Sequence, residues 1–215
     1  MDIIEKGNVI EKKSGFPSGD VLGSVAGRIF VRGTAGIDLQ DYVDSVVKAF
    51  TIDGVLTFVP PKYYIYSYFV NAGMADKTSL ITALILVDFE RMQEIYAQYG
   101  DDIIIKGYVT ADGRPCNSIG ISAAYSIVST SDCKEGAWEF IKFSLTNNYS
   151  TDFPSNKRML QEMIDEELAH AGEEKRSTFY TEQGPVNYHY ATQEEIDTVM
   201  NLIENVELPR HLAVR

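Results

Sequence analysis

The sequence predicts a layered α/β fold, and three observations support this. Short runs of β-branched and aromatic residues alternate with segments whose apolar residues recur at helical spacing. Gly, Pro, Asn and Asp mark most boundaries between these segments. The chain has 215 residues, of which 45% are hydrophobic and 23% charged, so it can bury a core and is ordinary in composition for a globular protein.

The elements predicted in the first half follow a glycine-rich segment, residues 1–36, where only Arg28–Val31 resembles a strand. Asp38 is expected to cap a helix to Ala49, because an apolar stripe begins at Leu39 and recurs at i+3, i+4, i+7 and i+8. A second helix is expected from an Asp88 cap to Tyr99, followed by Gly100. Strands are predicted over residues 55–59, 63–70, 80–87 and 103–108.

The second half is expected to contain a loop over residues 110–118, a strand over 121–128 and three helices. The first helix follows Ser131 or Asp132, with Glu135 in capping-box spacing, and its apolar face is predicted to pack on the sheet. That face consists of Ala137, Trp138, Phe140 and Ile141. Ser155 is expected to cap a helix to about Ala171, and Thr192 to Glu195 forms a capping box for the last one. Residues 172–191 are polar and are predicted to form a loop.

The charge and the hydropathy pattern exclude several classes of partner. The formal net charge of −12 makes nucleic acid and anionic membranes unfavourable partners. No run approaches 18 apolar residues, so we expect no membrane span. The N-terminal residues lack the apolar region of a signal peptide, which predicts a cytoplasmic location for the chain as written.

No residue pattern points to catalysis, a metal or a cofactor. His170, His189 and His211 have no ligand at metal-site spacing, and Cys116 and Cys133 match no zinc or redox motif. A nucleophile elbow and a glycine-rich phosphate loop are both missing from the sequence. We therefore expect a protein that is not an enzyme and has no cofactor.

Several segments, taken in order, resemble the family 1 extracellular solute-binding proteins of bacterial ABC importers. They cover roughly residues 38–206; the most informative is Gly107–Leu145, which contains the helix sequence KEGAWEFIKF. DGVLTFVPP at residues 53–61 resembles a strand and turn of that family, and FPSNK at 153–157 and the helix after Thr192 also match in order.

The resemblance implies a periplasmic-binding-protein-like fold of type II, a sugar or oligosaccharide ligand, ABC permease subunits as partners and an extracellular or cell-surface location. Members of the family are longer and have two lobes, whereas only about ten residues separate Val70 from Leu80 here. We therefore expect an incomplete fold, mainly one lobe, with residues 1–36 poorly defined, 37–206 forming the lobe and 207–215 a tail. The alternative is a non-binding remnant or interaction module that keeps the fold.

The resemblance also places a ligand site where two segments meet. Tyr63, Tyr64 and Tyr66 are expected to stack on a sugar, and Asn117 and Ser118, in the loop 114–120, to hydrogen-bond its hydroxyl groups. In the alternative interpretation the tyrosines belong to the core and the loop is only a connector.

Overall fold

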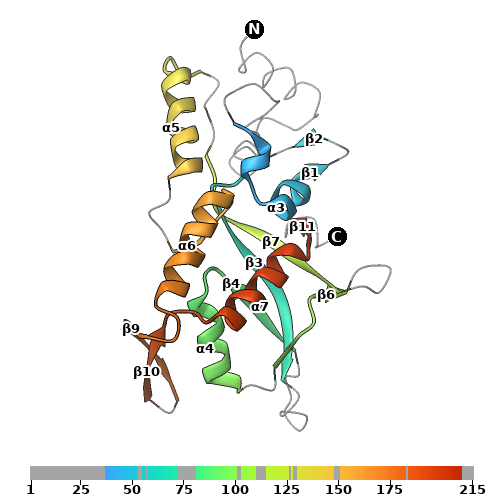
Figure 1. Ribbon diagram of the computed structural model, residues 1–215. Helices are drawn as coiled ribbons and strands as arrows, with labels where there is room; N and C mark the ends of the chain where they lie inside the picture. The colour runs from blue at the N-terminus through green and yellow to red at the C-terminus, as the bar shows by residue number, and fades with distance from the viewer. Residues whose placement is uncertain are drawn as a thin grey trace.

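The computed structural model describes residues 37–52, 55–56, 58–71, 81–100, 103–109, 115–125, 127, 130–147, 151–182 and 184–209. The strand predicted at 28–31 lies outside these residues. The described chain is a mixed α/β structure in which helices pack on a central sheet, as the sequence predicts at this coarse level (Figure 1). None of the described helices is long and apolar enough to cross a bilayer.

The strand β3 (Lys62–Asn71) is the centre of the sheet. It pairs antiparallel with β4 (Ile81–Leu86) on one side and β7 (Pro115–Ala123) on the other. The short strands β5 (Ile103–Ile105) and β8 (Phe153–Pro154) extend these pairings with β3, and β6 (Tyr108–Val109) pairs with β7. On the far side of β7 lies β11 (Val206–Pro209), the parallel partner that makes the sheet mixed.

The described helices that contact the sheet all contribute to one apolar core. These are α3 (Asp44–Ala49), α4 (Glu90–Tyr99), α6 (Lys157–Ala169) and α7 (Gln193–Glu204), and Figure 1 shows α4, α6 and α7 in front of the strands. A 3-10 turn, η1 (Leu39–Asp41), precedes α3, and a small pair, β1 (Thr51–Ile52) with β2 (Val55–Leu56), follows it. The helix predicted over 38–49 is therefore interrupted after its first turn.

The core forms because β3 alternates its side chains between two faces. Tyr63, Ile65 and Phe69 are buried against the helices. Between them, the buried Ser67 hydroxyl donates to Asn117 Oδ1 at 2.8 Å, and Asn117 Nδ2 donates to the Leu202 carbonyl at 3.0 Å. The two polar side chains thus satisfy each other and fix α7 to the sheet.

The helix caps agree with the sequence at three of five sites. One of these is Asp38, which accepts from the Gln40 N–H at 3.0 Å at the start of η1. Thr192 and Glu195 form the predicted capping box, and Asp88 accepts from the Arg91 N–H at 2.9 Å. At α6 the cap is Asn156, which accepts from the Met159 N–H, and not Ser155, whose side chain is buried one residue earlier. At α5 (Lys134–Thr146) no side chain caps the first turn, so the predicted box with Glu135 is wrong.

The predicted packing of α5 on the sheet is also wrong. This helix stands apart from the other helices in Figure 1, and it contacts a second, smaller apolar cluster through Ile141 and Leu145. Trp138 is half-buried at the edge of that cluster, and Phe140 is 56% exposed. The periodicity identified the helix correctly but not the surface on which it packs.

Besides the two-residue strands β1 and β8, one hairpin and the strand β11 were not predicted. Residues 172–191, expected to form a loop, contain an antiparallel hairpin of β9 (Glu174–Thr181) and β10 (Gly184–His189). The sheet also continues beyond the boundary set at residue 206, because β11 runs to Pro209. The hairpin strands β9 and β10 are rich in polar residues and β11 is short, so none of the three shows the apolar pattern of a typical strand.

Candidate binding site

A cluster of aromatic rings lies on the face of the sheet that is turned away from the four helices. Tyr64, Tyr66 and Tyr68 alternate with the core residues of β3, and Tyr108 joins them from β6. We call these four residues the tyrosine face. Exposed isoleucines at positions 81, 85 and 104 border it, and the cross-strand register places them on the same side.

The rings of the tyrosine face contact one another closely. Tyr66 and Tyr108 are stacked with centroids 5.5 Å apart and planes 26° apart. Tyr68 meets Tyr108 edge-on at 4.8 Å and Tyr66 edge-on at 5.8 Å. The Tyr108 hydroxyl shares hydrogen bonds with those of Tyr68 and Tyr66, and partial burial raises its pKa above the ordinary value. The Tyr108 phenol therefore stays neutral at physiological pH, and the three rings together present a platform with polar edges.

Two glycines bring these rings into position. Gly120 is the cross-strand partner of Tyr64, and a Cβ atom at Gly120 would lie 2.0 Å from Cζ of that ring. Gly107, with φ of +65°, joins β5 to β6, and a Cβ there would lie 2.5 Å from the Cys116 carbonyl oxygen. Glycine at both positions permits the close backbone approach that places Tyr64 flat on β7 and Tyr108 beside Tyr66.

The structure brings together only some of the residues predicted for the site. Tyr64 and Tyr66 lie on the tyrosine face, and Ser118 is the cross-strand partner of Tyr66. The Ser118 hydroxyl is fully buried and has no hydrogen-bond partner in the described structure. It lies at the base of the platform, beneath the rings rather than at their surface.

Tyr63 and Asn117 lie on the opposite face. Tyr63 is 0% exposed and packs 6.0 Å from Phe153, so its ring cannot stack on a ligand from solvent, and burial raises the pKa of its hydroxyl. Both polar ends of Asn117 are used by Ser67 and Leu202. The predicted loop at 114–120 is strand β7 from Pro115 onward, and this change places Asn117 in the core.

Tyr68 and Tyr108 belong to the cluster although sequence reasoning did not select them. Tyr68 could have been found from the two-residue period of β3, because residues 64, 66 and 68 must share a face. Tyr108 carried no such signal, since its position depends on the turn at Gly107 and on pairing with Cys116.

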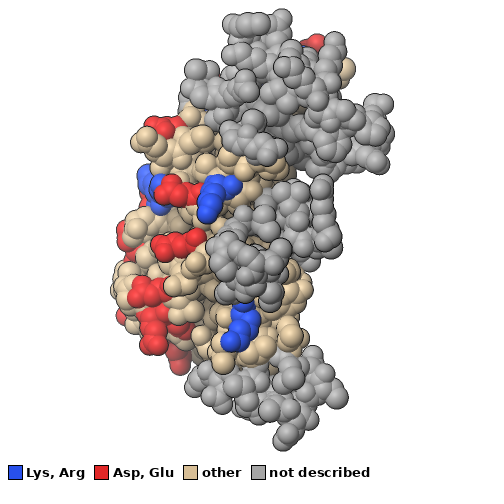
Figure 2. Space-filling model, turned by 90° about the vertical axis from the view of Figure 1, so that its right-hand side faces the viewer, with Lys and Arg blue, Asp and Glu red and all other residues tan. Residues whose placement is uncertain are grey.

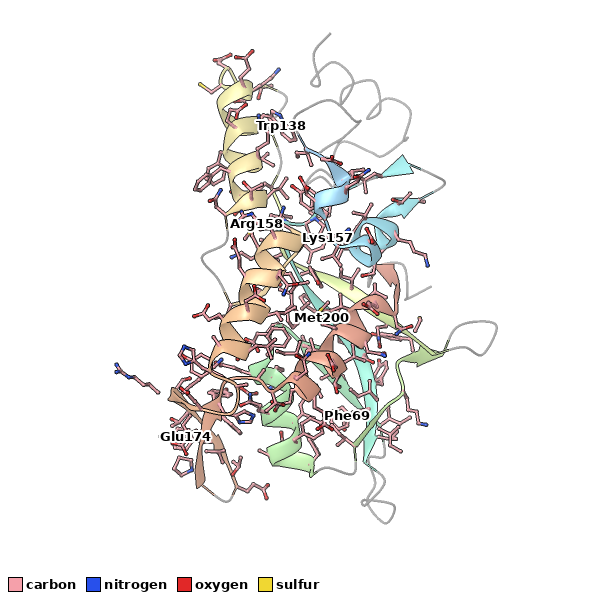
Figure 3. The ribbon with its side chains drawn as sticks, viewed as in Figure 1. Phe69, Trp138, Lys157, Arg158, Glu174 and Met200 are labelled. Carbon is pink, nitrogen blue, oxygen red and sulfur yellow. The ribbon has the colours of Figure 1, made fainter. Side chains whose placement is uncertain are left out.

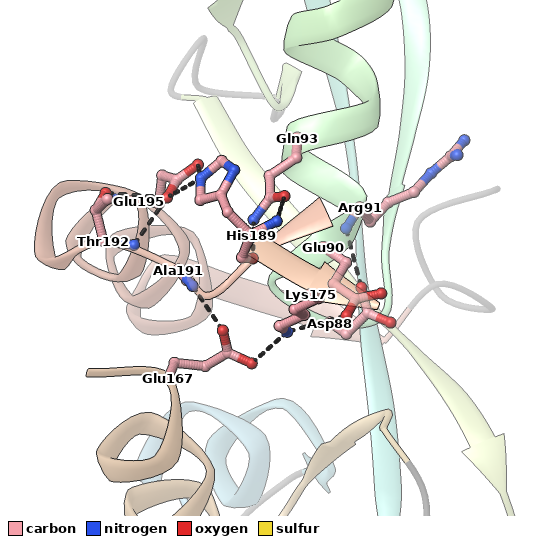
Figure 4. A network of polar contacts seen from close by, with 10 residues as sticks. All are labelled: Asp88, Glu90, Arg91, Gln93, Glu167, Lys175, His189, Ala191, Thr192 and Glu195. Atoms are coloured by element: carbon pink, nitrogen blue, oxygen red, sulfur yellow. Dashed lines mark hydrogen bonds and ion pairs between the residues drawn. The ribbon is translucent and has the colours of Figure 1, made fainter. Parts of the chain in front are cut away.

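A second polar cluster connects the β9–β10 hairpin to the helices (Figure 4). Lys175 Nζ contacts Glu90 at 2.9 Å and Glu167 at 2.8 Å, and it lies 4.9 Å from the centroid of the Tyr190 ring. Glu167 also accepts from the Ala191 N–H at 2.6 Å. The ammonium group thus joins three elements, β9, α4 and α6.

The remaining polar groups of this cluster are also paired. Gln93 and the backbone of His189 exchange two hydrogen bonds, of 2.9 and 3.0 Å, and the His189 ring contacts Glu195 at 3.0 Å. Burial raises the pKa of Asp88 to about 6, and nearby carboxylates including Glu90 add to this effect. Because its groups satisfy one another, we assign this cluster a structural role.

The described part of the chain contains no group of three or more His, Cys, Asp or Glu side chains able to hold a metal ion. A cavity of about 570 Å³ separates α3, α6 and α7, with Lys157 and Met200 on its walls (Figure 3). Its floor is apolar, and Lys157 pairs with Asp44 at 2.9 Å across it. The tyrosine face is the better candidate because its aromatic and hydroxyl groups converge on one surface.

Comparisons with known proteins find no matching family model, no matching curated protein and no matching solved structure.

Proposed function

We propose that this protein is the substrate-binding component of an ABC transporter and that its ligand is a carbohydrate. The observation that carries the proposal is the stacked Tyr66–Tyr108 pair, with Tyr68 against its edge, on the sheet face away from the helices. A pyranose presents C–H groups on its faces and hydroxyl groups around its rim. It can therefore stack on such rings while it exchanges hydrogen bonds with the phenols.

The proposed role is binding without chemistry. Within the described residues, His170 and His189 each contact a glutamate, Glu173 and Glu195, and neither lies beside an aligned nucleophile. The Tyr108 hydroxyl, with its raised pKa, is a poor base at neutral pH. The sugar would therefore be released from the tyrosine face chemically unaltered, as delivery to a permease requires.

The transport part of the proposal rests on the resemblance to family 1 solute-binding proteins. That family has the type II periplasmic-binding-protein-like fold, acts outside the cell and closes two lobes around a sugar. If this chain supplies mainly one lobe, its site is an open surface. We then expect a dissociation constant of roughly 1 mM or weaker, because an open platform buries fewer contacts and excludes less water.

The experiment is an NMR titration of the ¹⁵N-labelled protein with a panel of oligosaccharides. We expect shifts in β3, β6 and β7, and their loss in Tyr66→Ala and Tyr108→Ala. The matched control is Tyr180→Ala, because Tyr180 is 82% exposed on the hairpin, far from these strands. Equal binding by all three variants, or no shifts with any sugar, would contradict the proposal.

The alternative is an interaction module that keeps the fold and binds no sugar. The exposed Ile81, Ile85 and Ile104, at 63%, 40% and 45%, favour it because they extend the tyrosine face with an apolar surface. In that case sugars would leave the spectrum unchanged, and Ile85→Ser with Ile104→Ser would reduce self-association measured by sedimentation.

A further inference from the structure

The acidic residues of this chain avoid the strands that form the tyrosine face. The chain has 31 Asp and Glu residues, yet none occurs in β3, β4, β5, β6 or β7. In Figure 2 the acidic side chains gather along the left of the view, the side that carries the helices. Among the residues that the structure describes, the negative charge is therefore concentrated away from the sheet face that we propose for binding.

Two lysines lie beside the tyrosine face, on the same side of the sheet. Lys62 begins β3, where the pairing with β7 shifts register between Lys62 and Tyr63. Partly buried and buried positions still alternate from Lys62 onward, which places Lys62 on the same side as Tyr64, Tyr66 and Tyr68. Lys106 continues the register of β5 with β3 and donates its N–H to the Tyr68 carbonyl at 2.7 Å, which places it opposite Tyr68. Neither lysine forms an ion pair with another described residue.

The two lysines stand at opposite ends of the row of rings. Lys62 and Tyr68 are six residues apart on one strand, which corresponds to about 20 Å. A short oligosaccharide lying along β3 would stack on the tyrosines and would have an ammonium group near each end. Lysine side chains are long enough to turn toward a charge on the nearest sugar unit.

We propose that the ligand of the tyrosine face is an acidic oligosaccharide, one whose pyranose rings carry carboxylates as in uronic acids. This inference rests on the proposed function and specifies its substrate class. A carboxylate on the ligand is attracted by the ammonium groups of Lys62 and Lys106. On these strands it meets no acidic side chain that would repel it. A neutral sugar would be stabilised by stacking on the tyrosines but not by this electrostatic attraction.

The test compares two matched ligands, a β-1,4-linked glucose trisaccharide and the same trisaccharide oxidised to a carboxylate at each C6. NMR titration at low ionic strength should give a dissociation constant roughly five- to tenfold lower for the oxidised ligand. The preference should shrink at about 0.5 M NaCl, because salt screens exposed charges. The double variant Lys62→Met, Lys106→Met should lose it while its affinity for the neutral trisaccharide stays the same.

The control variant is Lys48→Met, because Lys48 is on α3, on the helix side of the sheet, and its removal should leave the preference intact. If both trisaccharides bind equally and binding depends on Tyr66, the acidic preference is overturned and the proposed function stands. If neither ligand shifts the tyrosine face, the proposed function falls and the preference falls with it. Retention of the preference in the Lys62/Lys106 double variant would also overturn the inference.

Discussion

Tyr63 and Tyr64 are neighbours in the chain but belong to two very different surfaces. Tyr63 is fully buried beside its cross-strand partner Phe153, whereas Tyr64 lies on the opposite face, across Gly120. The same contrast separates Ile65 and Phe69 from Tyr66 and Tyr68 along the whole strand. One face of β3 holds the fold together, and the other presents aromatic rings to a ligand, so substitutions on the two faces should have different consequences.

The largest expected difference is in stability. Phe69→Ala should lower the free energy of unfolding by about 3–5 kcal/mol, because Phe69 is 2% exposed and packs against Tyr99 at 5.0 Å. Tyr68→Ala, one residue away on the tyrosine face, should cost less than half as much. Urea denaturation measures both values, and equal losses would remove the distinction between the faces.

Asn117→Ala should lower the unfolding free energy by about 2 kcal/mol, because it leaves Ser67 and the Leu202 carbonyl without their partner inside the core. The matched control is Ser122→Ala on the same strand, where the side chain is exposed and the change should stay within about 0.5 kcal/mol. A mild effect at Asn117 accompanied by loss of sugar binding would instead support the role predicted from the sequence.

Gly120→Ala tests how the tyrosine face is assembled. The new Cβ would meet the far end of the Tyr64 side chain, which can swing aside, so stability should change by no more than about 1 kcal/mol. The NMR signals of Tyr64 and its neighbours should move even so. A crystal structure of this variant with the Tyr64 ring in its original place would show that the glycine does not position it.

The last expected effect is a pH dependence of stability that belongs to the helix side. Burial raises the pKa of Asp88 to about 6 from its ordinary value of 3.8, so the folded protein binds this proton more tightly than the unfolded chain. The contribution is fully present below about pH 4 and is lost as the pH rises through about 6. Asp88→Asn keeps an oxygen for the Arg91 N–H and should flatten this part of the curve of melting temperature against pH.

Where the sequence failed to predict the fold, the reason was usually a contact between distant residues. The strand β3 and the helix after Thr192 were predicted nearly in full, because period and caps are local properties. The surface on which α5 packs, the hairpin at 174–189 and the strand β11 depend on partners that local patterns do not contain. Mixed pairing in the sheet is likewise set by topology and not by composition.

The candidate site shows the same limit. Alternation along β3 is sufficient to separate Tyr63 from Tyr64 and Tyr66, and it should have added Tyr68. Asn117 and Ser118 were selected because Pro115 and nearby turn residues suggested a loop, whereas pairing with β3 and β11 extends the strand over them. Tyr108 reaches the cluster only through the positive φ of Gly107, and no pattern in the sequence reveals that conformation.

The central position of β3 has a consequence for the folding rate. Its partners lie as near as β4 and as far along the chain as β8, where Lys62 pairs with Pro154. Synthesis therefore completes β3 long before its last partner leaves the ribosome, and during that interval its tyrosines and isoleucine have no complete sheet to join. Such non-local pairing places folding in the range of milliseconds to seconds, and substitutions in β3 that weaken early pairing with β4 should slow folding more than they speed unfolding.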